Sequence, residues 1–236
     1  MRQSATLLLD AGDSLRFDAE PALSSQGATS IVALNRMAYD AVTVGEGDLA
    51  VGLDAFKQRQ AEAKFPFLSA NLVLRASGEL LAKPLAILNV QGRLVAVIGL
   101  TGAQDVAPDG PFAIRDPLET LRVILPEAAK LADFVIVLSH AGLEVDREIV
   151  RSMPEVGLVV RGGVGTLPAP ETGAAGGLIV QAEQPTAGHA GRFLGVARLA
   201  LDVSGRLKGQ AWQPLSLGPE VPDDPALADW ANGLPR

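Results

Sequence analysis

The chain has 236 residues, a formal net charge of −7 and 48% apolar residues, which suffices for one large α/β domain or two small ones. The negative charge and the scattered Lys and Arg argue against a nucleic-acid surface or a polybasic membrane patch. No apolar stretch reaches the roughly 18 residues that insertion across a membrane requires. The chain contains no cysteine, which excludes disulfides and cysteine metal sites.

Apolar runs and helical periodicity alternate along the chain and predict an α/β fold. Gln91-Gly92 joins two of the predicted strands in a β-hairpin, and Asp116, Pro117 and Glu119 form a well-capped helix start. The main domain is expected over residues 1–217, followed by a proline-rich tail, 218–236, with one short helix. The predicted strands are 6–10, 41–44, 67–74, 86–90, 94–100, 134–138, 158–161, 177–182, 192–203 and 207–215; the predicted helices are 31–39, 53–63, 117–132, 143–152 and 225–232.

The stretch 40–52 carries the strongest motif. An apolar run, 41–44, breaks at Gly45 into an acidic, glycine-rich loop, and sites in open α/β folds form just past the carboxyl ends of strands. The stretch resembles the Gly-Asn-His-Glu-Phe-Asp-x-Gly signature of calcineurin-like metallophosphoesterases, in the 5′-nucleotidase branch. Gly45 and Gly52 keep the spacing of the two glycines that flank this signature. Matching segments follow in family order over 6–215. The resemblance implies a two-sheet β-sandwich flanked by helices (αββα), without the family's first strand.

Three residues match metal-ligand positions of that family. Asp13, in Leu-Asp-Ala-Gly-Asp, corresponds to an Asp that bridges two metal ions, and His140, in Ser-His-Ala-Gly, to a histidine ligand. Glu46 stands where the family has an Asn ligand, and its carboxylate could still bind a metal. On the residues alone, an ordinary strand-to-loop turn at Asp13 and a structural role for His140 remain open. The second histidine, His189, is expected to be exposed in a loop.

Other positions depart from the family pattern. Gly47 replaces the histidine that would protonate the leaving group, Ala50 replaces the Asp that orients it, and Gly163 and Gly165 replace two metal ligands. The Asp-x-His pair of the family's first strand occurs nowhere in these 236 residues, through truncation or loss. A missing general acid costs about 10²–10⁴ in rate. We therefore expect no cofactor, or at most one weakly bound divalent ion, Mn, Zn, Ca or Mg.

Three further residues are expected to line the site. Asp48 stands at a Glu position that is not a ligand in the family, and Asn71 is expected to be a structural hydrogen-bonding residue. Unpaired carboxylates in a partly buried cleft would repel one another. One hypothesis is that Arg161 replaces the lost cation and pairs with Asp13 or Glu46. The alternative is that Arg161 points to solvent.

The sequence supports two functional hypotheses. The first is a degenerate, non-catalytic 5′-nucleotidase-like domain that acts as a binding or structural component. The second is a divergent metal-dependent phosphohydrolase, acting on a nucleotide or other phosphoester, that uses Asp13, Glu46 and His140. Without the first strand, the sheet edge beside strand 6–10 invites strand pairing, so a partner protein, a second copy or the C-terminal tail is expected to cover it. No signal peptide is recognisable in residues 1–10, and the compartment is left open; resembling proteins are mostly exported, which favours an extracytoplasmic location.

Overall fold

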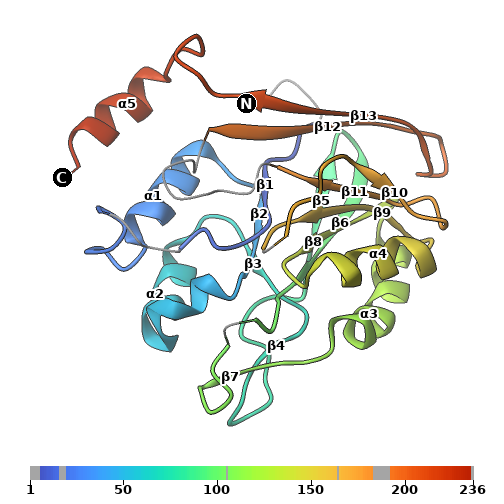
Figure 1. The fold of residues 1–236 in the computed structure, drawn as a ribbon, viewed down its shortest axis with the longest axis horizontal. Coiled ribbons are helices and arrows are strands. Elements are labelled where there is room, and N and C mark those ends of the chain that lie inside the picture. The colour runs from blue at the N-terminus through green and yellow to red at the C-terminus, as the bar shows by residue number, and fades with distance from the viewer. Residues whose placement is uncertain (1–5, 16–19, 105, 164, 183–191, 235–236) are drawn as a thin grey trace.

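The computed structural model describes residues 6–15, 20–104, 106–163, 165–182 and 192–234. The loop that carries His189 lies outside the described residues. Figure 1 shows two groups of helices on opposite sides of the central strands, with a long β-ribbon packed across one end. The chain is therefore a mixed α/β sandwich, as the sequence predicts, with helices on both outer faces.

The central strands belong to two sheets. One is a short parallel sheet in the order β1-β2-β3, and the other has six strands in the order β10-β11-β9-β8-β6-β5. Parallel pairing joins β6, β8, β9 and β11, so their carboxyl ends lie along one edge of the sheet. The bounds are β1 Leu9–Asp10, β2 Ala41–Thr43, β3 Phe67–Leu68, β5 Leu85–Val90, β6 Arg93–Leu100, β8 Phe134–Ser139, β9 Val156–Arg161, β10 Glu171–Thr172 and β11 Leu178–Gln181.

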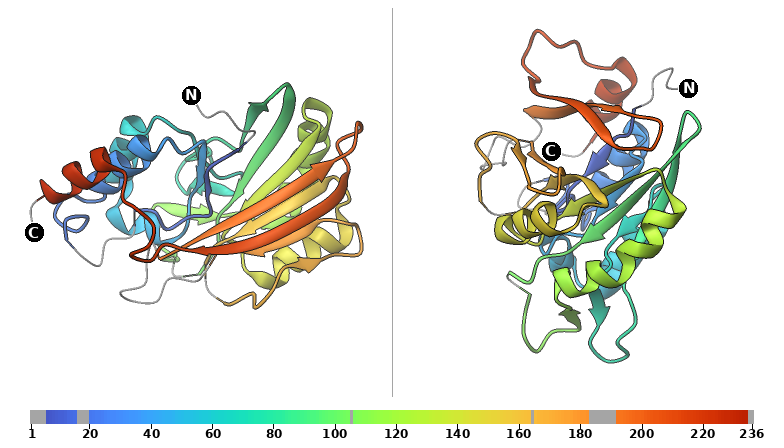
Figure 2. Two further views of the ribbon diagram at one scale, coloured as in Figure 1. Left: turned by 90° about the horizontal axis from the view of Figure 1, so that it is seen from above. Right: turned by 90° about the vertical axis from the view of Figure 1, so that its right-hand side faces the viewer.

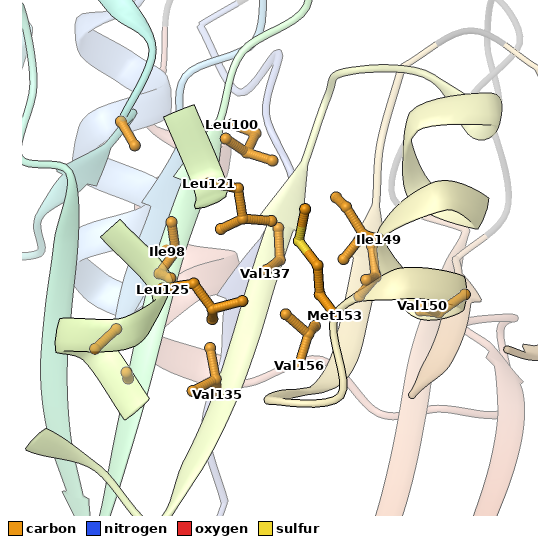
Figure 3. Close-up of a cluster of buried hydrophobic side chains, with 14 of the residues drawn as sticks. Ile98, Leu100, Leu121, Leu125, Val135, Val137, Ile149, Val150, Met153 and Val156 are labelled. Atoms are coloured by element: carbon orange, nitrogen blue, oxygen red, sulfur yellow. The ribbon is translucent and has the colours of Figure 1, made fainter. Parts of the chain in front are cut away.

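Three apolar layers hold these elements together. Helices α1 (Ala28–Met37) and α2 (Leu53–Glu62) pack on the short sheet, and α3 (Pro117–Leu131) and α4 (Leu143–Ser152) pack on the outer face of the six-stranded sheet. Figure 3 shows the second of these layers, where Leu121 and Ile149 face Val137. A third buried cluster includes residues of both sheets and fills the space between them. Burial on both faces explains why the central strands are continuous apolar runs.

The last part of the chain forms a separate ribbon. Strands β12 (Phe193–Leu201) and β13 (Leu207–Ser216) pair only with each other among the described strands, and no residue of either strand is fully buried. Figure 2 shows this ribbon lying across the sandwich, with the C-terminal helix α5 (Pro225–Asn232) beside α1. Within the described residues, no helix is long and apolar enough to cross a membrane.

Two predicted elements need correction. The run 67–74 is not one strand: β3 ends at Leu68, and β4 (Leu72–Leu74) pairs with β7 (Phe112–Ile114) in a different sheet. The chain turns at Asn71, whose side-chain amide hydrogen-bonds both the N–H and the carbonyl of Thr101 at 2.8 Å. The helix predicted from residue 31 begins at Ala28. The first turn of α1 lies in a polar stretch without helical periodicity. The short 3₁₀ helix η1 (Gly47–Val51) lies in a glycine-rich loop that has no such periodicity either.

Candidate metal site

Loops after three strands bring together the three predicted ligand residues. Asp13 follows β1, Glu46 follows β2 and His140 directly follows β8. One ligand atom from each side chain lies within 4.8 Å of the other two. Within the described part of the chain, this is the one group of three or more His, Asp or Glu residues found with such spacing. The site therefore lies at the carboxyl ends of parallel strands, as the sequence predicts.

The imidazole of His140 lies between the two carboxylates. Its Nδ1 is 2.5 Å from Oε2 of Glu46, and its Nε2 is 3.6 Å from Oδ2 of Asp13. The side chain of His140 is 1% exposed. Burial alone would lower the pKa of His140, but the hydrogen bond with Glu46 and the charge of Asp13 outweigh it, so this pKa is raised. When protonated, His140 supplies the positive charge between the two carboxylates that one hypothesis from the sequence assigned to Arg161.

Glycines surround the His140 ring. A Cβ atom at Gly12 or Gly162 would lie 2.8 or 2.9 Å from Cδ2 of His140, and one at Gly163 would lie 3.1 Å from both Cε1 and Nδ1. Gly163 also has a φ of +72°, in the region that favours glycine. The position where the resemblance implies a second histidine is therefore backbone packed against the first. Any side chain there requires the ring or the loop to move.

Asp48 is buried and lies outside the group formed by Asp13, Glu46 and His140. Its carboxylate accepts hydrogen bonds from three backbone N–H groups, those of Leu15 (2.6 Å), Gly45 (2.8 Å) and Asp13 (3.1 Å). Burial raises the pKa of Asp48 to about 7, although these N–H groups favour its charged form. It supports the backbone of both loops that carry carboxylate ligands.

Arg161 requires a correction. Its side chain is fully buried, and its Nε donates to Oδ2 of Asp146 at 3.0 Å, so it neither points to solvent nor forms the expected ion pair with Asp13 or Glu46. Sheet register explains the direction. Arg161 is paired with Ser139 in β8 and Gln181 in β11, and paired residues point to the same face, here the one covered by α4. His140, one residue past Ser139, is directed to the other side.

The residues around Arg161 form a network that the sequence analysis did not identify. Asp146, on α4, also accepts a 2.5 Å hydrogen bond from Oγ of Ser139. The guanidinium donates through Nη1 to the carbonyl of Gly165 at 2.7 Å and to Oε1 of Gln181 at 2.8 Å. This network holds the loop after β9, which packs on His140. Burial raises the pKa of Asp146 to about 6, against the lowering effect of its bonds to Ser139 and Arg161.

Asn71 has the structural role expected from the sequence. Besides its two bonds to Thr101, its side-chain nitrogen donates to the carbonyl of Arg115 at 3.2 Å, and the residue is 0% exposed. Asn71 therefore fixes the turn between β3 and β4.

The donor set fits one divalent ion better than two. Two carboxylates and an imidazole suit Mn²⁺ or Zn²⁺, since these ions accept mixed oxygen and nitrogen ligands. A two-metal site places its ions about 3.5–4 Å apart and needs ligands on both sides of each. The glycine backbone at Gly162 and Gly163 occupies one side of His140 and offers no side-chain donor. The described residues therefore do not fit a pair of ions.

Comparison with known proteins shows the class to which this fold belongs. The 5′-nucleotidase of Homo sapiens is 27% identical over 247 residues, which cover 94% of this chain and 42% of that protein. Protein UshA of Salmonella pullorum is 34% identical over 139 residues, 51% of this chain and 25% of its own length. The chain thus spans well under half of the curated relatives that it matches. It matches no protein-family model.

Solved structures agree with the sequence relatives. The 5′-nucleotidase precursor from Thermus thermophilus has a TM-score of 0.76 at 25% identity, over 96% of this chain and 48% of that one. The calcineurin-like phosphoesterase YfkN from Bacillus subtilis has a TM-score of 0.72 at 22% identity, over 92% and 79% of the two chains, and shows the shared fold. The fold is that of the calcineurin-like phosphoesterases. Within that class, this chain is a metallophosphoesterase domain of the 5′-nucleotidase branch.

Proposed function

We propose that this domain is a non-catalytic, 5′-nucleotidase-like component that binds at most one divalent ion and acts through binding or structure. The observation that carries the proposal is the packing of His140 against Gly163. It puts backbone where a second imidazole would be needed, and the ring hydrogen-bonds Glu46 instead. Gly47 also supports a non-catalytic role. It lies at the start of η1, where its backbone N–H donates to Asp13 at 2.8 Å, and it has no side chain that could protonate a leaving group.

The roles of the three side chains follow from their atoms. Asp13 and Glu46 would supply oxygen ligands, and His140 would supply a ring nitrogen once it has lost a proton. A bound divalent ion would supply Lewis-acid chemistry. His140 has a raised pKa and lies between two carboxylates, so its proton and an ion compete for the same position. A weakly held ion is the consequence.

A divergent phosphohydrolase is the second candidate. The convergence of Asp13, Glu46 and His140 within 4.8 Å favours it, because three ligands can hold one catalytic metal with open positions. Such an enzyme would lack a general acid and would be slow by about 10²–10⁴. Its substrate would be a phosphoester, with a nucleotide as the first one to try.

Hydrolysis assays distinguish the two candidates. The protein is incubated with a generic phosphate ester and with a nucleoside monophosphate under Mn²⁺, Zn²⁺ and Ca²⁺, alongside the His140→Ala variant. We expect no turnover above that of the variant. Turnover that requires His140 and a divalent ion would establish the second candidate and refute the first.

The binding role includes a partner at the edge of the short sheet. In the part of the chain that the structure describes, β1 pairs with β2 alone, and Leu7, Leu8 and Leu9 are only half-buried. The helix of the tail lies beside α1, where Trp230 of α5 packs on Arg36, 5.2 Å from ring centroid to guanidinium carbon. We propose that a strand of another protein chain pairs with β1. Hydrogen exchange of the Leu9 amide that stays fast in the native assembly would exclude such pairing.

A further inference from the structure

We infer that Asp48 is a positioning residue, which sets the spacing of the Asp13 and Glu46 carboxylates by joining the two loops that carry them. The inference rests on the proposed metal site and assigns a role to a residue outside its ligand set. Asp48 is 0% exposed, and both of its carboxylate oxygens accept backbone N–H groups. These bonds all come from backbone N–H groups and none from a ligand side chain. Asp48 would therefore act on the ligands by fixing the backbone of their loops.

The two loops hold each other reciprocally. Asp48, on η1, accepts the N–H groups of Asp13 and Leu15 from the first loop, and Asp13 accepts the N–H of Gly47 from the second at 2.8 Å. Asp13 has a φ of +63°, a left-handed backbone conformation that few non-glycine residues adopt. A strained backbone conformation persists only where its surroundings fix it. The N–H of Asp13 is fixed by Asp48.

This arrangement also brings like charges close together. One carboxylate oxygen of Asp13 and one of Glu46 lie within 4.8 Å of each other. Two negative charges at that distance repel each other. The loops are in close contact, because a Cβ at Gly45 or Gly47 would lie 2.2 or 2.7 Å from Oδ1 of Asp13. Without Asp48, nothing in the described contacts joins the N–H of Leu15 to the second loop. Of the described bonds, the one from the Gly47 N–H to Asp13 would remain, and the spacing of the two carboxylates would be less firmly fixed.

Asp48→Asn tests the inference with little change of shape. An amide accepts hydrogen bonds through one oxygen only, so its NH₂ group would face one or more of the three N–H donors. Asp40→Asn is the matched control. Asp40 precedes β2 and accepts the N–H of Leu8 at 2.6 Å, so it also joins β1 to β2, at the end of the strands away from the site.

Two readouts are compared in folded protein: the Mn²⁺ dissociation constant, from electron paramagnetic resonance, and the downfield ¹H signal of the His140 ring N–H that bonds Glu46. His189→Gln assigns that signal. We expect Asp48→Asn to weaken Mn²⁺ binding by about 10- to 100-fold and to shift or abolish the imidazole signal. Asp40→Asn should leave the affinity within about twofold and the signal unchanged.

The outcomes separate the inference from the proposed function. A wild-type protein that binds no Mn²⁺ contradicts the metal site, and the imidazole signal then still decides the role of Asp48. An Asp48→Asn protein with wild-type signal and affinity overturns the inference and leaves the metal site intact. Should Asp48→Asn fail to fold, Asp48→Glu gives the same test, because the added methylene displaces both oxygens. Unchanged affinity and signal in folded Asp48→Glu then overturn the inference.

Discussion

Replacement of Arg161 by Met should destabilise the fold in a pH-dependent way. Methionine fills much of the space of the arginine side chain but leaves Asp146 without its cation. The carboxylate would keep its bond to Ser139 and lose the one from Arg161. Breaking a buried ion pair by removing one partner typically costs about 3–5 kcal/mol, because the remaining charge is uncompensated. At pH 8, about two units above the pKa of Asp146, we expect a loss of that size.

At pH 5 the loss should be smaller. The folded-state pKa of Asp146, about 6, is raised above its usual 3.8, so this group stabilises the fold fully below pH 3.8 and the contribution is lost as pH rises through 6. Removing Arg161 raises this pKa further, since the arginine lowers it. With Asp146 protonated, no buried carboxylate is left uncompensated, and the lost bonds to Gly165 and Gln181 cost about 1–3 kcal/mol.

Urea unfolding of wild type and Arg161→Met at both pH values measures the difference. Arg147→Met is the control: Arg147 pairs with Glu144 and Glu171 at the surface, where ion pairs contribute little to stability. The double variant Arg161→Met/Asp146→Leu should recover much of the loss, because no buried charge remains. A loss that is equal at pH 5 and pH 8, or a double variant less stable than Arg161→Met, would refute this account of the pair.

Three further predictions concern the site. Gly163→His should destabilise the fold by about 1–3 kcal/mol in urea unfolding, because of its positive φ, and should not increase metal content; a second bound equivalent would contradict this. Asn71→Ala should lose about 1–3 kcal/mol per unsatisfied group at Thr101 but retain Mn²⁺ affinity, and weakened binding would place Asn71 in the site. Glu46→Gln should weaken Mn²⁺ binding at least about tenfold by calorimetry, and wild-type affinity would remove Glu46 from the ligand set.

Local signals predicted much of the fold. The hairpin at Gln91-Gly92 forms with φ values of 52° and 89°, which fit the turn that such a pair favours. The side chain of Asp116 accepts the N–H of Glu119 at 2.8 Å and begins α3 as its capping sequence indicates. The break within 67–74 could not be predicted, because it depends on bonds from Asn71 to a residue 30 positions away.

The site was predictable to the level of its position. The resemblance to family motifs selected Asp13, Glu46 and His140, and all three follow predicted strands, where sites form in open α/β folds. The direction of Arg161 requires the register with Ser139, which a single sequence does not give. A signal for Asp146 was present: it lies three residues before Ile149, on the apolar face of α4, and a carboxylate there needs a buried partner.

The number of divalent ions that the protein retains tests the central claim most directly. The protein is loaded with excess Mn²⁺ or Zn²⁺, desalted and analysed by elemental mass spectrometry, with His140→Ala as the control for non-specific binding. The loss of ligands at Gly163 and the single cluster of Asp13, Glu46 and His140 found among the described residues predict at most one equivalent per chain, absent from the variant. Two retained equivalents per chain would contradict the account.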